Sequence, residues 1–150
     1  MIHIYTDGSS RGNPGPGGYG IILKYGHYTK ELSQGYRRTT NNRMELLGVI
    51  IGLEALKADG QEVTIYCDSK YVLQPVEKGW LQVWLKKDFK GKKNADLWKR
   101  FWLVYQKHHV RLCWLKGHSG HQENERCDAL ALASSYQNLL IDTYYESIHN

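Results

Sequence analysis

The chain has 150 residues, of which 41% are hydrophobic and 23% are charged, and its formal net charge is +5. This length suits one domain built on a single core, so we expect a single domain over residues 1–150. No apolar run is long enough to cross a bilayer, which argues against a membrane-spanning helix. The sequence begins with a strand-like segment, and we expect no leader to be removed.

Cysteine usage points to a compartment. The three cysteines are widely spaced and form no Cys-x-x-Cys pair: Cys67, Cys113 and Cys127. This pattern favours free thiols in a reducing environment over disulfides or a zinc site. We therefore expect a cytoplasmic monomer with no membrane contact and no obligate protein partner.

The positive charge is concentrated in one window, from Lys86 to Arg100. This window holds seven lysines and arginines against Asp88 and Asp96, so it alone carries the net charge of +5. A basic patch on an otherwise neutral chain indicates binding to a polyanion, although it does not say which one.

Alternating polar and apolar residues predict a first strand over Ile2–Thr6. A loop rich in glycine and proline follows over Gly8–Gly18. Two further strands are predicted over Tyr19–Tyr25 and Tyr28–Gly35, and the short connections make these three strands an antiparallel meander. A helix is then predicted from Thr40–Asn42 to about Ala58, with Asn42 and Glu45 spaced as a capping box.

The second half of the sequence predicts a strand over Val63–Cys67, and the preceding helix implies a crossover that makes it parallel to the first strand. Short helical pieces follow, broken at Pro75, Gly79 and Gly91. A fifth strand over Val110–Leu115 and a helix from Glu123 to about Tyr136 complete the pattern. The expected fold is α/β, a five-stranded mixed sheet with three antiparallel strands, two parallel additions and helices on both faces. The tail, about 138–150, has weak signals and is expected to be poorly ordered.

Two strand ends in this pattern match each other. Ile4-Tyr5-Thr6-Asp7 and Ile65-Tyr66-Cys67-Asp68 each end in an aspartate, and the two aspartates have the same spacing from the preceding apolar residues. In parallel neighbours, both carboxylates emerge at one edge, where open α/β sheets bind ligands. Two such close carboxylates repel unless a cation lies between them, and oxygen ligands select magnesium or manganese.

Each acidic residue also has an ordinary structural interpretation. Asp7 can start an Asx turn, Asp68 can cap a helix at Ser69, and Glu45 can close the capping box. A column of small residues on the predicted helix favours a functional role for Glu45, because it lets the helix approach the sheet closely. The column consists of Gly48, Gly52 and Ala55.

Several blocks together resemble a known family. They are Tyr5-Thr6-Asp7-Gly8-Ser9, Gly12-Asn13-Pro14-Gly15-Pro16-Gly17-Gly18, Thr39-Thr40-Asn41-Asn42-Arg43-Met44-Glu45-Leu46, Asp68-Ser69, Lys116-Gly117-His118-Ser119-Gly120-His121 and Glu123-Asn124-Glu125-Arg126-Cys127-Asp128. In this order they resemble type 1 ribonuclease H from Ile2 to about Ser135, which is far more specific than a single glycine motif.

The resemblance implies a magnesium-dependent endonuclease (manganese is a possible substitute) that cuts the RNA strand of RNA–DNA hybrids and leaves 5′-phosphate and 3′-hydroxyl ends. Its four metal-binding carboxylates match Asp7, Glu45, Asp68 and Asp128, and its auxiliary histidine matches His118. A pair of ions about 3.5–4 Å apart can clamp such a displacement. His118 suits a proton shuttle or an aid to product departure, because histidine titrates near neutral pH.

The resemblance also implies the substrate contacts. Asn13 and Glu45 are expected to read the 2′-hydroxyl, and Thr40, Asn41 and Asn42 to bind a phosphate of the DNA strand. The segment of about 80–99 resembles the family's basic protrusion. Its candidate contacts are Trp80, Lys86, Lys87 and Lys90, whereas Trp98 and Trp102 are expected in the core. Lys70 stands where well-studied members have glutamine and is a further candidate contact, and Gly79 resembles a one-residue insertion.

Two alternatives remain at this stage. One is another nuclease of the same superfamily, which would share the acidic strand ends but not the Thr39–Leu46 block or the His118 loop. The other is a catalytically silent module that holds hybrids or double-stranded RNA. The four carboxylates disfavour this second alternative, since a pure binder gains nothing from negative charge facing phosphate.

Overall fold

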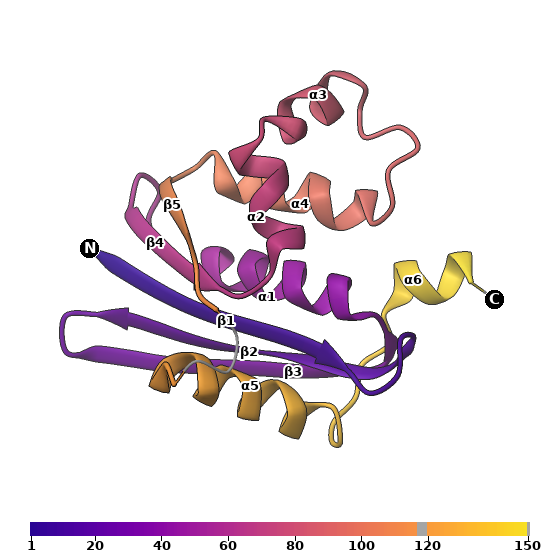
Figure 1. Cartoon of the computed structure of the whole chain (residues 1–150), viewed down its shortest axis with the longest axis horizontal. Coiled ribbons are helices and arrows are strands. Elements are labelled where there is room, and N and C mark those ends of the chain that lie inside the picture. Colours follow the sequence, from indigo (N-terminus) through magenta and orange to yellow (C-terminus); the bar gives the residue numbers. More distant parts are fainter. Residues whose placement is uncertain (117–119, 150) are drawn as a thin grey trace.

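A computed structural model describes residues 1–116 and 120–149, and it contains one five-stranded sheet in the order β3-β2-β1-β4-β5 (Figure 1). The first three strands are antiparallel neighbours: β1 (Ile2–Ser10), β2 (Gly15–Tyr25) and β3 (Tyr28–Thr39). Two shorter strands, β4 (Glu62–Cys67) and β5 (His109–Trp114), add in parallel on the other side of β1. This is the mixed sheet that the sequence predicts.

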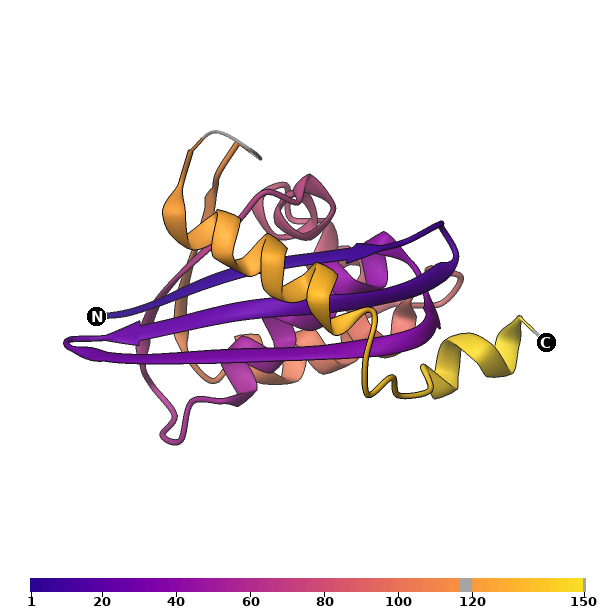
Figure 2. The ribbon, with the colours of Figure 1, turned by 90° about the horizontal axis from the view of Figure 1, so that it is seen from below.

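Helices cover both faces of the sheet. On one side lie α1 (Asn41–Glu54), α2 (Lys70–Glu77), α3 (Trp80–Lys86) and α4 (Ala95–Tyr105) (Figure 1). On the other side α5 (Gln122–Ser134) runs across the long strands, as Figure 2 shows. A short sixth helix, α6 (Thr143–Ile148), lies beyond the end of β3 near the C-terminus. Within the described residues, none of these helices has both the length and the apolar character that a membrane crossing requires.

The main core lies between α1 and the sheet. Ile4, Ile21 and Ile65 from three strands are fully buried against Ile50 and Leu53 of α1. The same core continues under α4, and its largest completely buried side chains there are Trp98 and Phe101. Trp98 is therefore a core residue, and Trp102 packs against the core partly exposed.

The strands are longer than the sequence pattern suggests. Of the loop predicted over Gly8–Gly18, only residues 11–14 lie outside strands. Glycine is depleted in strands, but here the missing side chains make room for a helix. A Cβ atom at Gly20 would collide with the carbonyl oxygen of Cys127, and one at Gly18 would collide with Ser134. The glycines of β2 thus allow α5 to lie directly on the sheet.

Two helix boundaries also differ from the prediction. The N-cap of α1 is Thr40, whose hydroxyl accepts a hydrogen bond from the Arg43 backbone N–H, so the predicted capping box of Asn42 and Glu45 does not form. The helix ends at Glu54, earlier than the predicted Ala58. Pro75 does not interrupt the helix but lies inside α2, whereas Gly79, at φ 73°, separates α2 from α3.

The tail contacts the domain through a buried aspartate. Asp142 is buried and caps α6 through the Tyr145 backbone N–H. Its carboxylate accepts hydrogen bonds from Thr39 at 2.7 Å and from Arg43 at 2.8 and 2.9 Å. The weak sequence signal arose because these partners lie about a hundred residues away along the chain.

Candidate active site and metal centre

The first two carboxylates meet through the pairing of β1 with β4. The parallel register places Tyr5 opposite Tyr66, and its continuation places Asp7 beside Asp68. Asp68 follows β4 directly, as predicted. Asp7 is not the last residue of its strand, because β1 continues to Ser10 through its pairing with β2.

Glu45 reaches this pair because α1 lies very close to β1. A Cβ atom at Gly8 would collide with the backbone of Met44 and Glu45, so only glycine fits between strand and helix there. One turn along α1, Gly48 approaches the Asp7 carbonyl oxygen, to which an added Cβ atom would lie 3.7 Å away. The predicted column of small residues therefore does bring Glu45 to the sheet.

The three side chains form a tight cluster of oxygen atoms. One carboxylate oxygen from each of Asp7, Glu45 and Asp68 lies within 4.8 Å of the others. Asp7 is 7% exposed, and its Oδ1 accepts a 2.9 Å hydrogen bond from the Gly8 backbone N–H. The structure thus brings together acids from three distant segments of the sequence.

Burial and mutual repulsion hold protons on this cluster. Burial, followed by repulsion from Asp68 and with Asp128 adding to it, raises the pKa of Asp7 to about 7. Burial and then repulsion from Asp7 raise the pKa of Glu45 well above its ordinary value. A hydrogen bond between Glu45 and Asp7 lowers the pKa of Asp7 and raises that of Glu45, so Glu45 is the partner that keeps the proton. A nearby positive charge would lower the pKa of both carboxyls, so the raised pKa values indicate that the cluster lacks a compensating cation from the described part of the chain.

One oxygen atom of the cluster indicates that a cation fits here. Glu45 Oε2 is shielded from solvent and has no hydrogen-bond partner among the described residues. Buried polar atoms without partners are rare in folded proteins and often mark a missing ion or water. Three carboxylates with an unsatisfied oxygen suit a hard divalent cation that prefers oxygen ligands.

The fourth predicted acid, Asp128, approaches the cluster from α5. It is half-buried and close enough to Asp7 to raise the pKa of that carboxyl by repulsion and hydrogen bonding. It is not part of the tight three-residue group. The neighbouring Cys127 thiol donates to the Tyr5 carbonyl oxygen at 3.3 Å, which fastens this part of α5 to β1.

Comparison with known proteins decides the family. The RNase H family profile matches residues 1–136. The chain belongs to the RNase H family. It is 50% identical to the ribonuclease H of Desulforamulus reducens over 94% of this chain and 92% of that one. It is also 50% identical to the ribonuclease H of Pectobacterium atrosepticum, over 98% and 97% of the two chains.

The fold comparison agrees. The crystal structure of LC9-RNase H1, a type 1 RNase H with the type 2 active-site motif, matches with a TM-score of 0.81 and 29% identity, covering 90% of this chain and 72% of that chain. The enzyme class predicted from the sequence, a ribonuclease H, is confirmed by these relatives. His118, the fifth predicted catalytic residue, lies outside the described residues.

One small pocket contains two of the predicted phosphate contacts, Thr40 and Asn42, together with Asn13, which is predicted to read the 2′-hydroxyl. Asn13, Thr40 and Asn42 border a cavity of about 140 Å³ at the start of α1. Asn41 lies beside it, where its backbone N–H donates to Asn13 Oδ1 at 3.1 Å and its own Oδ1 accepts from the Ser10 N–H at 2.7 Å. The structure thus brings all four residues together.

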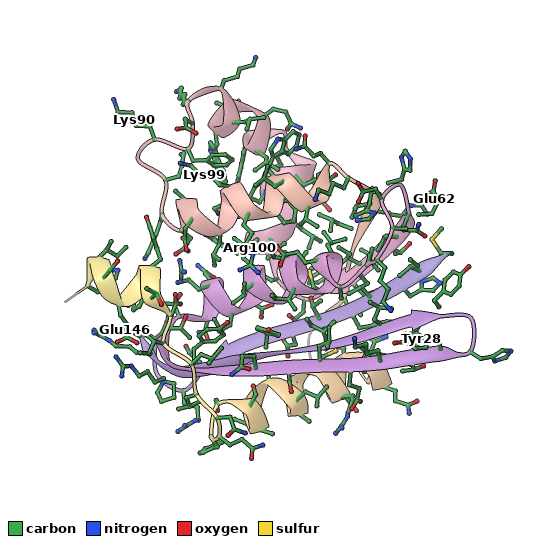
Figure 3. All side chains as sticks on the ribbon, turned by 180° about the vertical axis from the view of Figure 1, so that it is seen from behind. Tyr28, Glu62, Lys90, Lys99, Arg100 and Glu146 are labelled. Carbon is green, nitrogen blue, oxygen red and sulfur yellow. The ribbon has the colours of Figure 1, made fainter. Side chains whose placement is uncertain are left out.

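The basic protrusion of about 80–99 consists of α3, the following turns and the first half of α4, and it stands away from the sheet (Figure 1). Its exposed lysines include Lys86, Lys87, Lys90, Lys92 and Lys93. Figure 3 shows Lys90 and Lys99 at this end of the molecule, far from Tyr28 at the tip of the β2–β3 hairpin. Trp80 is 41% exposed, so it is not a core anchor.

Sequence analysis missed several residues around the site. Lys93, Tyr145 and His149 complete the walls of this pocket, and two of them come from the tail. Trp114 donates its indole N–H to the carbonyl oxygen of Asp68 at 3.3 Å. Its place at the end of the strand beside β4 was a usable signal, whereas nothing in the local sequence around Tyr145 indicated its position.

Proposed function

We propose that this RNase H hydrolyses the RNA strand of RNA–DNA hybrids by divalent-metal catalysis, with Asp7, Glu45, Asp68 and Asp128 as the metal-binding residues. The observation that carries the proposal is the cluster of three carboxylates, in which a buried oxygen of Glu45 has no partner among the described residues. A silent binding module would gain nothing from this arrangement, because the negative charge faces a phosphate.

The cofactor that suits the cluster is Mg²⁺, with Mn²⁺ as a possible substitute, because all the ligand atoms are oxygens. Two divalent ions of this kind, when bound at one site, supply an activated water and neutralise the negative charge on the leaving 3′-oxygen. Asp7, which contacts Glu45 and lies beside Asp68 and Asp128, would hold the metal together with these three residues. His118 is proposed to transfer a proton or to help the product leave.

Two surfaces are proposed to hold the hybrid. The pocket formed by Asn13, Thr40 and Asn42, with Asn41 beside it, offers amide and hydroxyl donors at a helix start to a phosphate of the DNA strand. Asn13 and Glu45 are proposed to recognise the 2′-hydroxyl of the RNA strand. On the protrusion, Trp80, Lys86, Lys87 and Lys90 are proposed to contact the DNA backbone.

The proposed working state is a cytoplasmic monomer. All three cysteines are free thiols, and two of them, Cys67 and Cys127, are buried, as suits a protein of a reducing compartment. Burial raises the pKa of both buried thiols to about 12, so they are inert at neutral pH.

The test of the proposed activity uses matched labelled duplexes. RNA–DNA, RNA–RNA and DNA–DNA duplexes of one sequence are incubated with Mg²⁺ and then with a chelator. We expect cleavage of the RNA strand of the hybrid alone, and no cleavage after chelation. Equal cleavage of all three duplexes, or cleavage that survives chelation, would contradict the proposal.

The test of the site is Asp7→Asn. Losing the central ligand removes several kcal/mol of transition-state stabilisation, so we expect the cleavage rate to fall by about a thousandfold or more. Binding of the hybrid, measured in Ca²⁺, should remain, because the pocket and the protrusion are intact. The matched control Asp59→Asn changes an exposed acid away from the cluster and should keep full activity. Full activity in Asp7→Asn would refute the assignment.

A further inference from the structure

A lysine and a tryptophan form a pair at the edge of the sheet that carries the carboxylates. Lys70 is the first residue of α2, two positions after Asp68, and its Nζ lies 5.1 Å from the centre of the Trp114 ring. Trp114 is the last residue of β5 and is 44% exposed. Because β4 and β5 are parallel, with Cys67 opposite Trp114, the pair stands at the C-terminal edge beside Asp68.

The indole is fixed relative to the active site. Trp114 Nε1 donates to the Asp68 carbonyl oxygen at 3.3 Å, and the next residue, Leu115, donates its backbone N–H to the Cys67 carbonyl oxygen at 2.8 Å. A lysine ammonium over a tryptophan ring is attracted by about 0.5–1 kcal/mol at an exposed site. Trp114 therefore restricts where the Lys70 ammonium can lie relative to Asp68.

The attraction to Trp114 is roughly offset by the position of Lys70 on α2, so the fold gains little stability from a cation here. The N-terminus of a helix carries partial positive charge, so a lysine there is unfavourable by about 0.3–1 kcal/mol. The first turn of α2 contains no acidic residue that would compensate. Among the described residues, Lys70 forms no ion pair with a carboxylate. The charge is thus available to a ligand at the rim of the cluster.

We propose that Lys70, held in place by Trp114, binds a backbone phosphate of the hybrid next to the phosphate that is cleaved, and that Trp114 is a positioning residue for this contact. The inference rests on the proposed function. Successive phosphates of one strand are separated by about 3.4 Å along the duplex axis, so a neighbour of the reacting phosphate passes close to Asp68. An ammonium is a compact point charge that suits a phosphate oxygen.

The first test is Lys70→Gln, which removes the charge and keeps most of the side-chain length. Affinity for the hybrid is measured in Ca²⁺ over a series of KCl concentrations, and kcat and KM are measured in Mg²⁺. We expect the dissociation constant to rise roughly two- to fivefold. The slope of log affinity against log salt should fall by about one, as for one lost phosphate contact. KM should change more than kcat.

A matched control is Lys107→Gln, which removes the same charge at the opposite end of β4, where the Lys107 carbonyl oxygen accepts from Gly60. This variant should keep the salt slope of the wild type. An unchanged slope in Lys70→Gln, or an equal change in both variants, would overturn the phosphate contact.

Two substitutions of Trp114 test its positioning role. Both remove the indole N–H, but Trp114→Phe keeps an aromatic face for Lys70 and Trp114→Leu does not. We expect Trp114→Leu to approach the affinity and the salt slope of Lys70→Gln without any change in chain charge, and Trp114→Phe to lose less. Adding Lys70→Gln to Trp114→Leu should cause little further loss, because both changes remove one interaction. Equal losses in Phe and Leu variants, or no loss in either, would overturn the role of the ring.

Failure of this inference is distinguishable from failure of the proposed function. If the wild-type protein neither binds nor cleaves the hybrid, the proposed function is wrong. If the wild-type protein does both and the Lys70 and Trp114 variants match it, only the inference is wrong. Thermal unfolding of each variant shows whether a loss of affinity merely reflects a loss of folded protein.

Discussion

The carboxylates of the active site act against the stability of the metal-free fold. The pKa of Asp7 is raised to about 7, first by burial and then by repulsion from Asp68. The unfolded chain gives up this proton above about pH 4, whereas the folded chain keeps it until about pH 7. The folded state is therefore penalised increasingly as the pH rises from about 4 to 7, and the full penalty remains above pH 7.

This sign leads to a prediction for metal-free protein. In a chelator at pH 8, Asp7→Asn should be more stable than the wild type by on the order of 2–4 kcal/mol, and its advantage should vanish near pH 4. Mg²⁺ should stabilise the wild type at pH 8 much more than the variant, because it binds the ionised cluster. Urea unfolding at pH 4 and pH 8 measures both effects. A wild type whose stability is independent of pH over this range would contradict the prediction.

At the scale of elements, close contacts of helices with strand glycines position the site. The backbone of α1 at Met44 and Glu45 occupies the space that a side chain at Gly8 would need. On the other face, Gly20 plays the same part for α5 and so for Asp128. Glu45 and Asp128 both approach Asp7 because α1 and α5 lie against β1 and β2 from opposite sides, more closely than ordinary side chains permit.

The contrast between two glycines of the same interface tests this view. Gly8→Ala must push α1 away, so it should cost about 1–3 kcal/mol of stability and lower activity by displacing Glu45. Gly48→Ala adds a methyl group whose nearest neighbour, Tyr19 Cβ, lies at 3.4 Å, an ordinary contact. Its gain in helix propensity, about 0.5–1 kcal/mol, should offset any crowding. Thermal unfolding and hybrid cleavage compare the two, and equal effects would contradict the argument.

At the scale of the whole molecule, one buried arginine joins distant parts of the chain. Arg43 is 3% exposed and binds Asp96 of α4 and Asp142 of the tail, each through two hydrogen bonds of 2.8–2.9 Å. Burial lowers its pKa, but the hydrogen bonds and charges of the two aspartates outweigh burial and raise it. The residue next to Arg43 in sequence, Asn42, lines the pocket at the start of α1 together with Tyr145 of α6. The network therefore holds both walls of that pocket.

Breaking this network should be costly. Arg43→Met leaves Asp142 buried without its cation, and we expect a loss of about 3–5 kcal/mol of stability. The matched change Arg37→Met removes an ion pair between an exposed arginine of β3 and Glu146 of α6, and should alter stability little. Urea unfolding compares the two variants, and a similar small loss in both would show that the buried network contributes little.

The sequence by itself determined the order of strands and helices and the identity of the acids. Strand periodicity placed Asp7 and Asp68 at matching positions, and the crossover rule made their strands parallel, as the structure confirms. The blocks around these residues indicated the RNase H family, which the relatives confirm. Such features are local or topological, so a linear pattern carries them.

The tertiary structure alone decided where the glycine strands run, which residue caps α1 and how the tail is held. Local preference placed Gly8–Gly18 in a loop, but the approach of α5 made strand glycines favourable. Local spacing paired Glu45 with Asn42, but Thr40 caps the helix and leaves Glu45 for the cluster. Asp142 carried no local signal, because its partner Arg43 is 99 residues away. Burial and distant contacts outweigh local propensity, since they involve larger free energies than a single turn or cap provides.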